Sequence, residues 1–398
     1  MAAPAPAVQS RAIPRLTGVR FGPLYDKPGQ MYSHPMAAAG DKSNRKPLKG
    51  HGALSNPAGR FERRRREALD DGWYQQEPPD APPVSIEPDR ARSVISTNDS
   101  PDIPFEQSIN PYRGCSHACC YCYARPSHGY VGLSPGLDFE TRLFYKQDAA
   151  KLLERELSRP GYVCKPINMG SNTDPYQPIE RRMRVTRDIL EVLAGCRHPL
   201  TIITKGALVL RDLDLLTRLA RDNLVSVGIS ITTLDLELKR RMEPQAASPR
   251  ARLEAVRALS EAGVPSGVLV APVIPALTDH EMESILEAAA DGGAGWASYI
   301  VLRLPYEVKA LFQEWLAAHY PDRAQHVMSL VRQMRGGKEN DPRFGSRMRG
   351  CGPFAELLRN RFHVACRRLG LNTRRAGGLD VLSFRPPRAQ SPQLSLDL

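Results

Sequence analysis

Three closely spaced cysteines are the residues of this chain best suited to chemistry. They are Cys115, Cys119 and Cys122, with three and then two residues between them. Cysteine thiolates hold iron–sulfur clusters, and three of them bind three irons of a [4Fe–4S] cluster. The fourth iron then has no protein ligand and is open to a small molecule. The spacing therefore predicts a reactive cluster rather than one that only transfers electrons.

A zinc site is the alternative use of this loop, with His117 or Cys120 as the fourth ligand. Structural zinc sites usually take two separated pairs of ligands that converge as a tetrahedron. No second pair follows the loop in this sequence. The spacing therefore favours the iron–sulfur cluster.

The composition indicates a globular enzyme. Of the 398 residues, 41% are hydrophobic, and the chain has no apolar run of about 18 residues that would span a bilayer. Half of the eight cysteines lie in one loop and the rest are scattered. This distribution favours a metal site in a reducing compartment over a disulfide framework. The first residues lack the apolar stretch of a secretory signal, so we expect a cytoplasmic protein with no membrane partner.

The positive charge is concentrated towards the ends of the chain. Of the formal net charge of +12, residues 1–95 carry +5 and residues 331–398 carry +9, while residues 96–330 carry −2. A basic flank beside a nearly neutral centre favours a polyanionic partner such as nucleic acid. A solvated basic tail is the alternative.

From residue 105 onwards, short apolar runs alternate with amphipathic stretches. The predicted strands are residues 108–112, 167–169, 200–204, 225–231, 268–270 and 298–302. The predicted helices between and after them are residues 146–157, 185–194, 213–220, 248–262, 280–290 and 307–318. Such alternation indicates a parallel sheet covered by helices. Six units suit an α/β fold of the open (β/α)6 TIM-like type, although periodicity alone also fits a flat doubly wound sheet.

The predicted domain organisation follows from composition. Residues 1–100 are rich in proline, glycine and alanine and predict a mostly irregular extension, in which residues 52–61 are less random than their surroundings. Residues 101–320 hold the partial barrel. Residues 321–385 predict a basic helical region, with helices at 325–334 and 353–369. Residues 386–398 predict a disordered tail.

The ends of the predicted strands supply the remaining candidate residues, because chemistry in parallel α/β folds gathers at the carboxyl ends of strands. Polar side chains follow the second, third and fourth strands. They are Ser171, Asn172, Asp174, Lys205, Ser230 and Thr232. Side chains alternate along a strand, so Ser230 and Thr232 share one face.

The cysteine loop resembles the cluster loop of radical SAM enzymes. The matching residues are Gly114, Cys115, Cys119, Tyr121, Cys122 and Tyr123. The resemblance implies that the three cysteines hold a [4Fe–4S] cluster whose open iron chelates S-adenosylmethionine (SAM). It also implies that Tyr121 lies near the adenine. An electron donor such as flavodoxin or ferredoxin is then required, and cleavage of SAM yields a 5′-deoxyadenosyl radical.

The same resemblance implies that the polar side chains at the strand ends bind SAM. Where these enzymes typically hold the amino group of SAM with a Gly-Gly-Glu-like segment, this chain has Ser171, Asn172 and Asp174 as the nearest polar replacements. Lys205 is placed to pair with the SAM carboxylate. Ser230 and Thr232 are placed to meet the ribose or the carboxylate.

Over about residues 105–305 the chain resembles, more narrowly, the spore photoproduct lyase-like branch of the superfamily, often labelled DNA-repair photolyases. Thr173-Asp174 and Thr204-Lys205 carry this narrower match. It implies a lyase-like DNA repair or modification reaction. The hydrogen-donating cysteine of that lyase has no counterpart in residues 169–172, which argues against photoproduct reversal as such. Cys164, Cys351 or a tyrosine are the remaining candidate donors.

The last six residues resemble the Gln-Leu-x-Leu-x-Leu peptide that docks bacterial repair proteins on the DNA sliding clamp. In that mode Gln393 fills a polar pocket, and Leu396 and Leu398 fill an apolar cleft. This peptide favours a nucleic-acid substrate. A radical SAM enzyme for a peptide or small molecule, and a non-catalytic metal-binding nucleic-acid module, are the alternatives.

Overall fold

The computed structural model describes residues 47–61, 82–373 and 378–387. Most of the predicted N-terminal extension lies outside these ranges. The same holds for the clamp-like peptide with Gln393, Leu396 and Leu398, and for nearly all of the predicted tail. Among the described residues, no helix is long and apolar enough to cross a bilayer.

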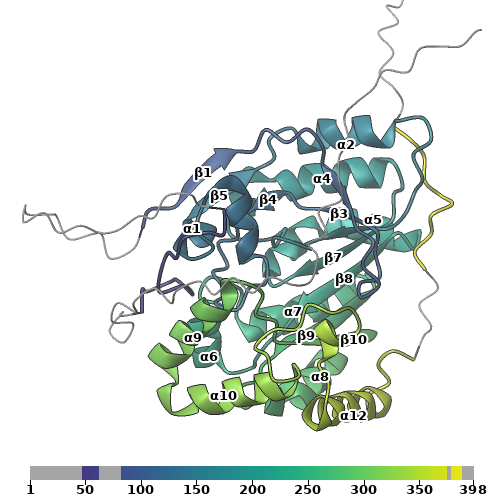
Figure 1. Ribbon diagram of the computed structural model, residues 1–398. Helices are drawn as coiled ribbons and strands as arrows, with labels where there is room; N and C mark the ends of the chain where they lie inside the picture. Colours follow the sequence, from purple (N-terminus) through teal and green to yellow (C-terminus); the bar gives the residue numbers. More distant parts are fainter. Residues whose placement is uncertain (1–46, 62–81, 374–377, 388–398) are drawn as a thin grey trace, which may run out of the picture. The chain divides into compact units, whose positions relative to one another are not determined.

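The described residues form ten strands and twelve α-helices (Figure 1). The strands are β1 (Ser85–Pro88), β2 (Ile95–Thr97), β3 (Gln107–Ile109), β4 (Tyr112–Arg113), β5 (Arg142–Tyr145), β6 (Ile167–Met169), β7 (Leu200–Thr204), β8 (Val225–Ser230), β9 (Ser266–Val273) and β10 (Trp296–Val301). The helices are α1 (Leu137–Thr141), α2 (Ala149–Leu157), α3 (Glu180–Met183), α4 (Val185–Gly195), α5 (Leu213–Arg221), α6 (Leu236–Met242), α7 (Pro249–Glu261), α8 (Met282–Asp291), α9 (Val308–His319), α10 (Pro321–Gln333), α11 (Ser346–Arg349) and α12 (Pro353–Arg368). Three short 3-10 helices are η1 (Arg125–Val131), η2 (Ala207–Asp212) and η3 (Asp279–Glu281).

The main sheet has the strand order β10-β9-β8-β7-β6-β3-β2. Its six strands from β3 to β10 are parallel and neighbour one another in the order of the sequence, and β2 adds an antiparallel edge. A doubly wound sheet reverses its strand order at a switch point, and this sheet does not. Within the described chain no pairing joins β10 back to β3. The predicted open (β/α)6 partial barrel is therefore confirmed.

The main core lies between this sheet and the helices that follow its strands. Leu190 of α4, Leu216 of α5, Val256 of α7 and Leu286 of α8 are fully buried in it. The α7 helix illustrates how the sequence sets an element. Ser248 accepts a hydrogen bond from the Ala251 amide at 3.2 Å, and proline follows it at the first helical position. The predicted start of this helix is confirmed.

The predicted first strand, residues 108–112, is wrong in one respect, because it divides into β3 and β4. Pro111 stands between them and has no N–H to donate to a ladder. While β3 joins the main sheet, β4 joins a second sheet of order β1-β5-β4. The strands β1 and β2 also lie within residues 1–100, for which the sequence predicted a mostly irregular chain.

The described part of the N-terminal region, residues 47–61, has no helix or strand, yet it packs on the cysteine loop. Ala53 is 1% exposed, and Leu54 is buried. A Cβ at Gly52 would lie 1.8 Å from the Ala118 carbonyl oxygen, so this close backbone approach requires glycine. We define residues 50–57 as the docking segment, which belongs to the fold rather than to an extension.

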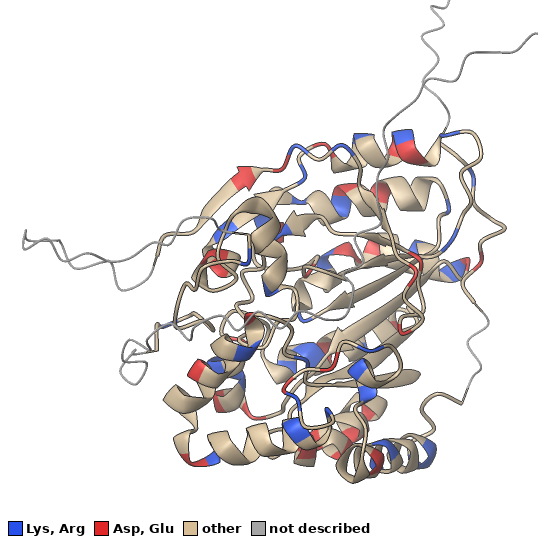
Figure 2. Ribbon diagram, in the orientation of Figure 1, with Lys and Arg blue, Asp and Glu red and all other residues tan. Residues whose placement is uncertain are grey.

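The C-terminal helices also join the barrel. Phe312 and Trp315 of α9 share an apolar cluster with Val327 and Val331 of α10 and with Tyr121 of the cysteine loop. The predicted boundary at residue 321 therefore cuts through one packed unit. Some basic side chains here are paired with acids, as Arg361 is with Glu283 at 2.6 Å. Figure 2 shows basic and acidic residues interspersed over the helices.

Candidate active site

One cavity of about 450 Å³ brings together most of the residues predicted from the sequence. Its wall contains Cys115, Cys119, Tyr121, Cys122, Tyr123, Ser171, Asn172, Asp174, Lys205 and Ser230. These residues come from the cysteine loop after β3 and β4 and from the carboxyl ends of β6, β7 and β8. Thr232 is the exception. It is fully buried next to the cavity, where its hydroxyl bonds to Glu243 at 2.7 Å and to the Ala271 carbonyl at 3.0 Å.

Local backbone contacts hold the cysteine loop in a tight coil. The amides of Ala118 and Cys122 donate to the carbonyls of Cys115 and Cys119, at 3.3 Å in each case. Gly114 enters the loop with φ of 74°, and a Cβ there would lie 2.8 Å from the Phe139 carbonyl oxygen. This position therefore requires glycine. The loop presents its three thiols on the cavity wall.

A buried ion pair supports the loop. Arg125 donates to the Cys119 carbonyl through Nε at 2.9 Å and Nη2 at 2.8 Å, and it pairs with Glu140. Glu140 also accepts from the amides of Gly52 at 3.2 Å and Ala53 at 2.8 Å. Both charged side chains are almost fully buried. The docking segment thus completes the hydrogen bonds of a carboxylate whose partner positions a cluster cysteine.

The donor set fits an iron–sulfur cluster. None of the three cysteines forms a disulfide. Burial raises the pKa of Cys115, Cys119 and Cys122, so the thiols need a bound cation to deprotonate near neutral pH. Of the two candidates for a fourth zinc ligand, His117 directs its Nδ1 to Asp174, and Cys120 does not line the cavity. These contacts do not favour the zinc alternative.

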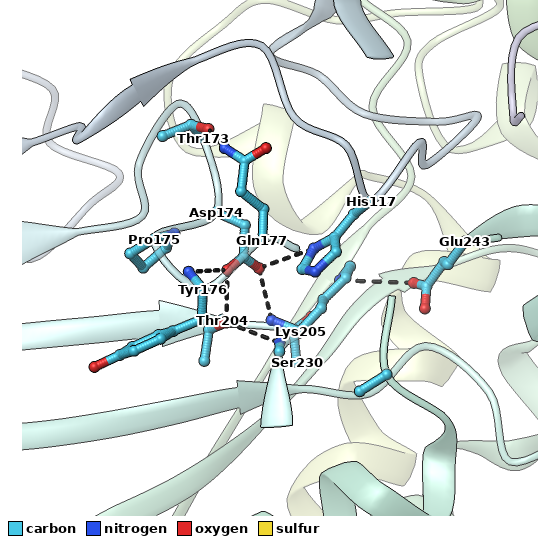
Figure 3. Close-up of polar contacts among 12 residues, drawn as sticks. His117, Thr173, Asp174, Pro175, Tyr176, Gln177, Thr204, Lys205, Ser230 and Glu243 are labelled. Atoms are coloured by element: carbon cyan, nitrogen blue, oxygen red, sulfur yellow. Dashed lines mark hydrogen bonds and ion pairs between the residues drawn. The ribbon is translucent and has the colours of Figure 1, made fainter. Parts of the chain in front are cut away.

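Asp174 lines the cavity, and Figure 3 shows its polar contacts with neighbouring residues. Its carboxylate accepts from the Thr204 hydroxyl at 2.6 Å and from the Lys205 amide at 2.7 Å. His117 Nδ1 lies 3.3 Å from the same carboxylate. Burial would raise the pKa of Asp174, but His117 and these hydrogen bonds outweigh burial and lower it. Asp174 therefore ties the cysteine loop to the end of β7.

The Lys205 ammonium lies in the cavity wall and points across the strand ends. Its Nζ donates to Ser230 Oγ at 2.6 Å and to the Ala271 carbonyl at 3.1 Å. Glu243 Oε1 lies 3.7 Å from it. A positive side chain held by neutral oxygens and one more distant carboxylate is suited to bind a carboxylate ligand.

Sequence reasoning missed Glu243 and Arg252, which are fully buried and paired with each other. Glu243 also accepts from the hydroxyls of Tyr121 and Thr232. Burial would raise the pKa of Glu243, but the charges of Arg252 and Lys205 outweigh burial and lower it. Both residues lie beyond the strand ends, and nothing in their spacing marks them in the sequence.

The loop after β6 is organised by Asn110. Its side chain exchanges hydrogen bonds with Ser171 Oγ and accepts from the Asn172 amide at 2.8 Å. The Tyr123 hydroxyl donates to the Ser171 carbonyl. Of the candidate hydrogen donors, the cavity wall contains Tyr121 and Tyr123 but not Cys164 or Cys351.

The cavity wall also contains residues from outside the cysteine loop and the ends of β6, β7 and β8. They include Asn98, Ile103, Phe105, Arg303, Arg347 and Met348. Arg347 pairs with Asp102 and donates to Ser100, and the Gly345 amide donates to Asp102 at 2.6 Å. These bonds join the chain before β3 to the segment around α11. Two regions distant in sequence therefore form this part of the wall together.

Comparisons with known proteins identify this arrangement. The family model of the radical SAM superfamily matches residues 109–289, which hold the cysteine loop and the strand ends that line the cavity. An uncharacterized protein of Mycobacterium tuberculosis is 40% identical over 233 residues, which are 58% of this chain and 68% of that protein. The chain belongs to the radical SAM superfamily. An uncharacterized protein of Acidianus two-tailed virus is 30% identical over 292 residues, covering 71% of this chain and 88% of that protein.

Among solved structures, this radical SAM protein is similar in fold to spore photoproduct lyase. The lyase with bound AdoMet and dinucleoside spore photoproduct matches with a TM-score of 0.53 and 18% identity, over 72% of this chain and 80% of the lyase. A further structure of the lyase, described as complexed with dinucleoside spore photoproduct, gives a TM-score of 0.52. The predicted resemblance to this branch is confirmed at the level of the fold.

Proposed function

We propose that this protein is a radical SAM enzyme that acts on nucleic acid, in DNA repair or modification. The observation that carries the proposal is one cavity whose wall contains the three cysteines and Lys205 together with the aromatic Phe105 and the basic Arg303. Substrate and cofactor must meet in one enclosed space for radical chemistry, because a primary radical reacts with whatever it meets.

In this proposal Cys115, Cys119 and Cys122 hold the [4Fe–4S] cluster, and SAM binds beside it. When bound, the cluster and SAM supply a 5′-deoxyadenosyl radical by one-electron cleavage of the SAM carbon–sulfur bond. The protein orients the reactants and excludes water. Lys205 binds the SAM carboxylate, while Asp174 and Glu243 hold the side chains and the backbone around Lys205 in place.

The substrate class is supported by the fold of spore photoproduct lyase, whose solved complexes contain a dinucleoside photoproduct. The loop after β6, residues 169–172, offers no cysteine as a hydrogen donor. We therefore propose a different reaction from reversal of that photoproduct, with Tyr123, which lines the cavity, as the hydrogen donor. A flavodoxin or a ferredoxin would supply the electron.

The test is anaerobic reconstitution with iron and sulfide, followed by turnover with SAM and a strong reductant. We expect a brown protein that forms 5′-deoxyadenosine, and faster formation when DNA or RNA is added. Deuterium in the nucleic acid should appear in the 5′-deoxyadenosine. Acceleration by peptides and not by nucleic acids would support the peptide alternative. A colourless protein that forms no 5′-deoxyadenosine would overturn the enzymatic proposal.

A further inference from the structure

A guanidinium group without an acidic partner lies in the cavity wall. Arg303 follows β10, and its Nε is buried without a hydrogen-bond partner among the described residues. Within the described part of the chain, its Nη1 donates a hydrogen bond only to the Met348 sulfur at 3.5 Å, which is a weak acceptor. Asp102, the acid whose charge acts on it, is already paired with Arg347. Buried polar groups are normally paired, so this side chain lacks an anionic partner.

The Arg303 guanidinium remains positively charged in the cavity wall. Burial lowers the pKa of Arg303, and the nearby Arg347 acts in the same direction. An arginine nevertheless stays protonated at neutral pH, because its ordinary pKa is so high. Leaving a buried donor unpaired is unfavourable. An anion that entered the cavity would remove this cost and would bind in preference to water.

Aromatic and apolar side chains adjoin this cation. The Tyr123 ring centroid lies 5.4 Å from Arg303 Cζ. Phe105 and Ile103, from the chain before β3, line the same cavity. Proteins bind single-stranded nucleic acid by combining a positive charge for the backbone with aromatic side chains for the bases. The part of the cavity wall around Arg303 therefore presents both features that bind a nucleotide.

We propose that Arg303 binds one phosphodiester of the substrate, and that the base of that nucleotide stacks on Phe105 and Tyr123. This inference rests on the proposed function and makes it more specific. It assigns a single nucleotide, unstacked from its neighbours, to the cavity. Since Arg347 is committed to Asp102 and Ser100, Arg303 supplies the ionic contact alone.

The experiment measures binding of a short fluorescent single-stranded DNA to the reconstituted full-length protein with SAM. Arg303→Gln is compared with Arg332→Gln, which removes an exposed arginine of α10 that is paired with Glu339 outside the cavity. We expect Arg303→Gln to weaken binding roughly tenfold or more, as for loss of a charged hydrogen bond. The slope of log affinity against log salt should fall by about 0.7, as for one phosphate on a single strand. Arg332→Gln should change the affinity less than twofold.

A neutral linkage in the DNA supplies the matching change on the ligand. One methylphosphonate, moved along the oligonucleotide, should weaken wild-type binding at one position about as much as Arg303→Gln does. At that position the methylphosphonate should not weaken DNA binding by Arg303→Gln any further, because this variant has already lost the same contact. Arg303→Lys keeps the charge, so it should retain the salt slope of the wild type even if Arg303→Gln unfolds the loop.

The outcomes separate the two proposals. If the wild type binds DNA and Arg303→Gln binds it with the same affinity and salt slope, Arg303 is not the phosphodiester ligand, while the proposed function stands. Additive losses from the methylphosphonate and Arg303→Gln would lead to the same conclusion. If the wild type binds neither DNA nor RNA oligonucleotides, the nucleic-acid function itself is overturned.

Discussion

At the scale of single residues, the site depends on thiols and ion pairs that lie out of contact with solvent. The three cysteines, Glu243 and Arg252 are each nearly or fully inaccessible, except for the partly exposed Cys122. Burial makes each of these groups dependent on its partner, because a charge without a partner is costly in a low-dielectric interior. Single substitutions here should therefore have large and distinguishable effects.

Replacing any one of Cys115, Cys119 and Cys122 by serine should abolish cluster binding, because two thiolates do not hold the cluster. The measurement is iron and sulfide content with visible absorbance after anaerobic reconstitution. Cys120→Ala is the matched control, since Cys120 lies in the same loop but does not line the cavity. A full cluster in a serine variant, or its loss in the control alone, would contradict the ligand assignment.

Glu243→Gln should destabilise the fold by about 3–5 kcal/mol at neutral pH, because it leaves the buried Arg252 without its partner. The pKa of Glu243 is lowered from its ordinary value of 4.5, since Arg252 and Lys205 outweigh burial. The stabilisation is therefore present above pH 4.5 and is lost as the pH falls through the folded-state pKa. Urea denaturation should show the difference between wild type and variant shrinking below about pH 4.5.

The control for this prediction is Glu254→Gln, which changes an exposed carboxylate of α7 that is paired with Arg257. This substitution should lower the free energy of unfolding by less than about 1 kcal/mol, as for surface ion pairs. Equal costs for the two variants would show that the Glu243–Arg252 pair contributes no more than a surface pair.

At the scale of elements, the cysteine loop is held from outside the barrel by a segment that has no regular structure. The docking segment reaches the loop through Gly52 and through the amides that bond to Glu140. Helices α9 and α10 close another side, in an apolar cluster that includes Tyr121. The loop is therefore fixed by parts of the chain that lie far from it in sequence.

Gly52→Ala should strain the cysteine loop, because the added Cβ would lie 1.8 Å from the Ala118 carbonyl oxygen. We expect a loss of about 1–3 kcal/mol of stability, as for an overpacked site, and faster loss of iron to a chelator. Gly195→Ala is the control, since a Cβ at this last residue of α4 meets nothing within 4 Å. If both variants release iron at the wild-type rate, the docking segment does not support the cluster loop.

At the scale of the whole molecule, the positive flank predicted from the sequence is partly neutralised within the fold. Arg347 and Arg361 pair with acids of the barrel, so the net charge of residues 331–398 overstates the basic surface they offer. Some of the residues on which the partner predictions rest lie outside the described ranges. Among them is the clamp-like peptide, which we propose docks the enzyme on the DNA sliding clamp.

The intact protein should bind a bacterial sliding clamp, and Gln393→Ala combined with Leu396→Ala should abolish binding, because both anchors of the extended peptide are lost. A titration followed by fluorescence anisotropy measures this. Ser395→Ala is the control, as it occupies a non-anchoring position of the same peptide. Equal binding by the intact protein and the double variant, or no binding by either, would remove the clamp from the proposal.

Much of the fold followed from the sequence because it rests on local patterns. The capping residues of α7, the apolar runs of β7 and β8 and the cysteine spacing are set by neighbours along the chain. The open barrel was predicted as one of two arrangements, since periodicity reports which face of an element is buried and not the order of the strands. Only the pairing of β3 through β10 decided between them.

The chemistry of the site divides in the same way. The cysteines and Lys205 were predictable, since their types and their places after apolar runs are local facts. The pair of Glu243 and Arg252, the support of Glu140 by the docking segment, and the unpaired Arg303 were not. Each depends on side chains brought together from distant parts of the chain, and on burial that removes water. Only the tertiary structure determines which charged side chains form ion pairs and that Arg303 remains without an acidic partner.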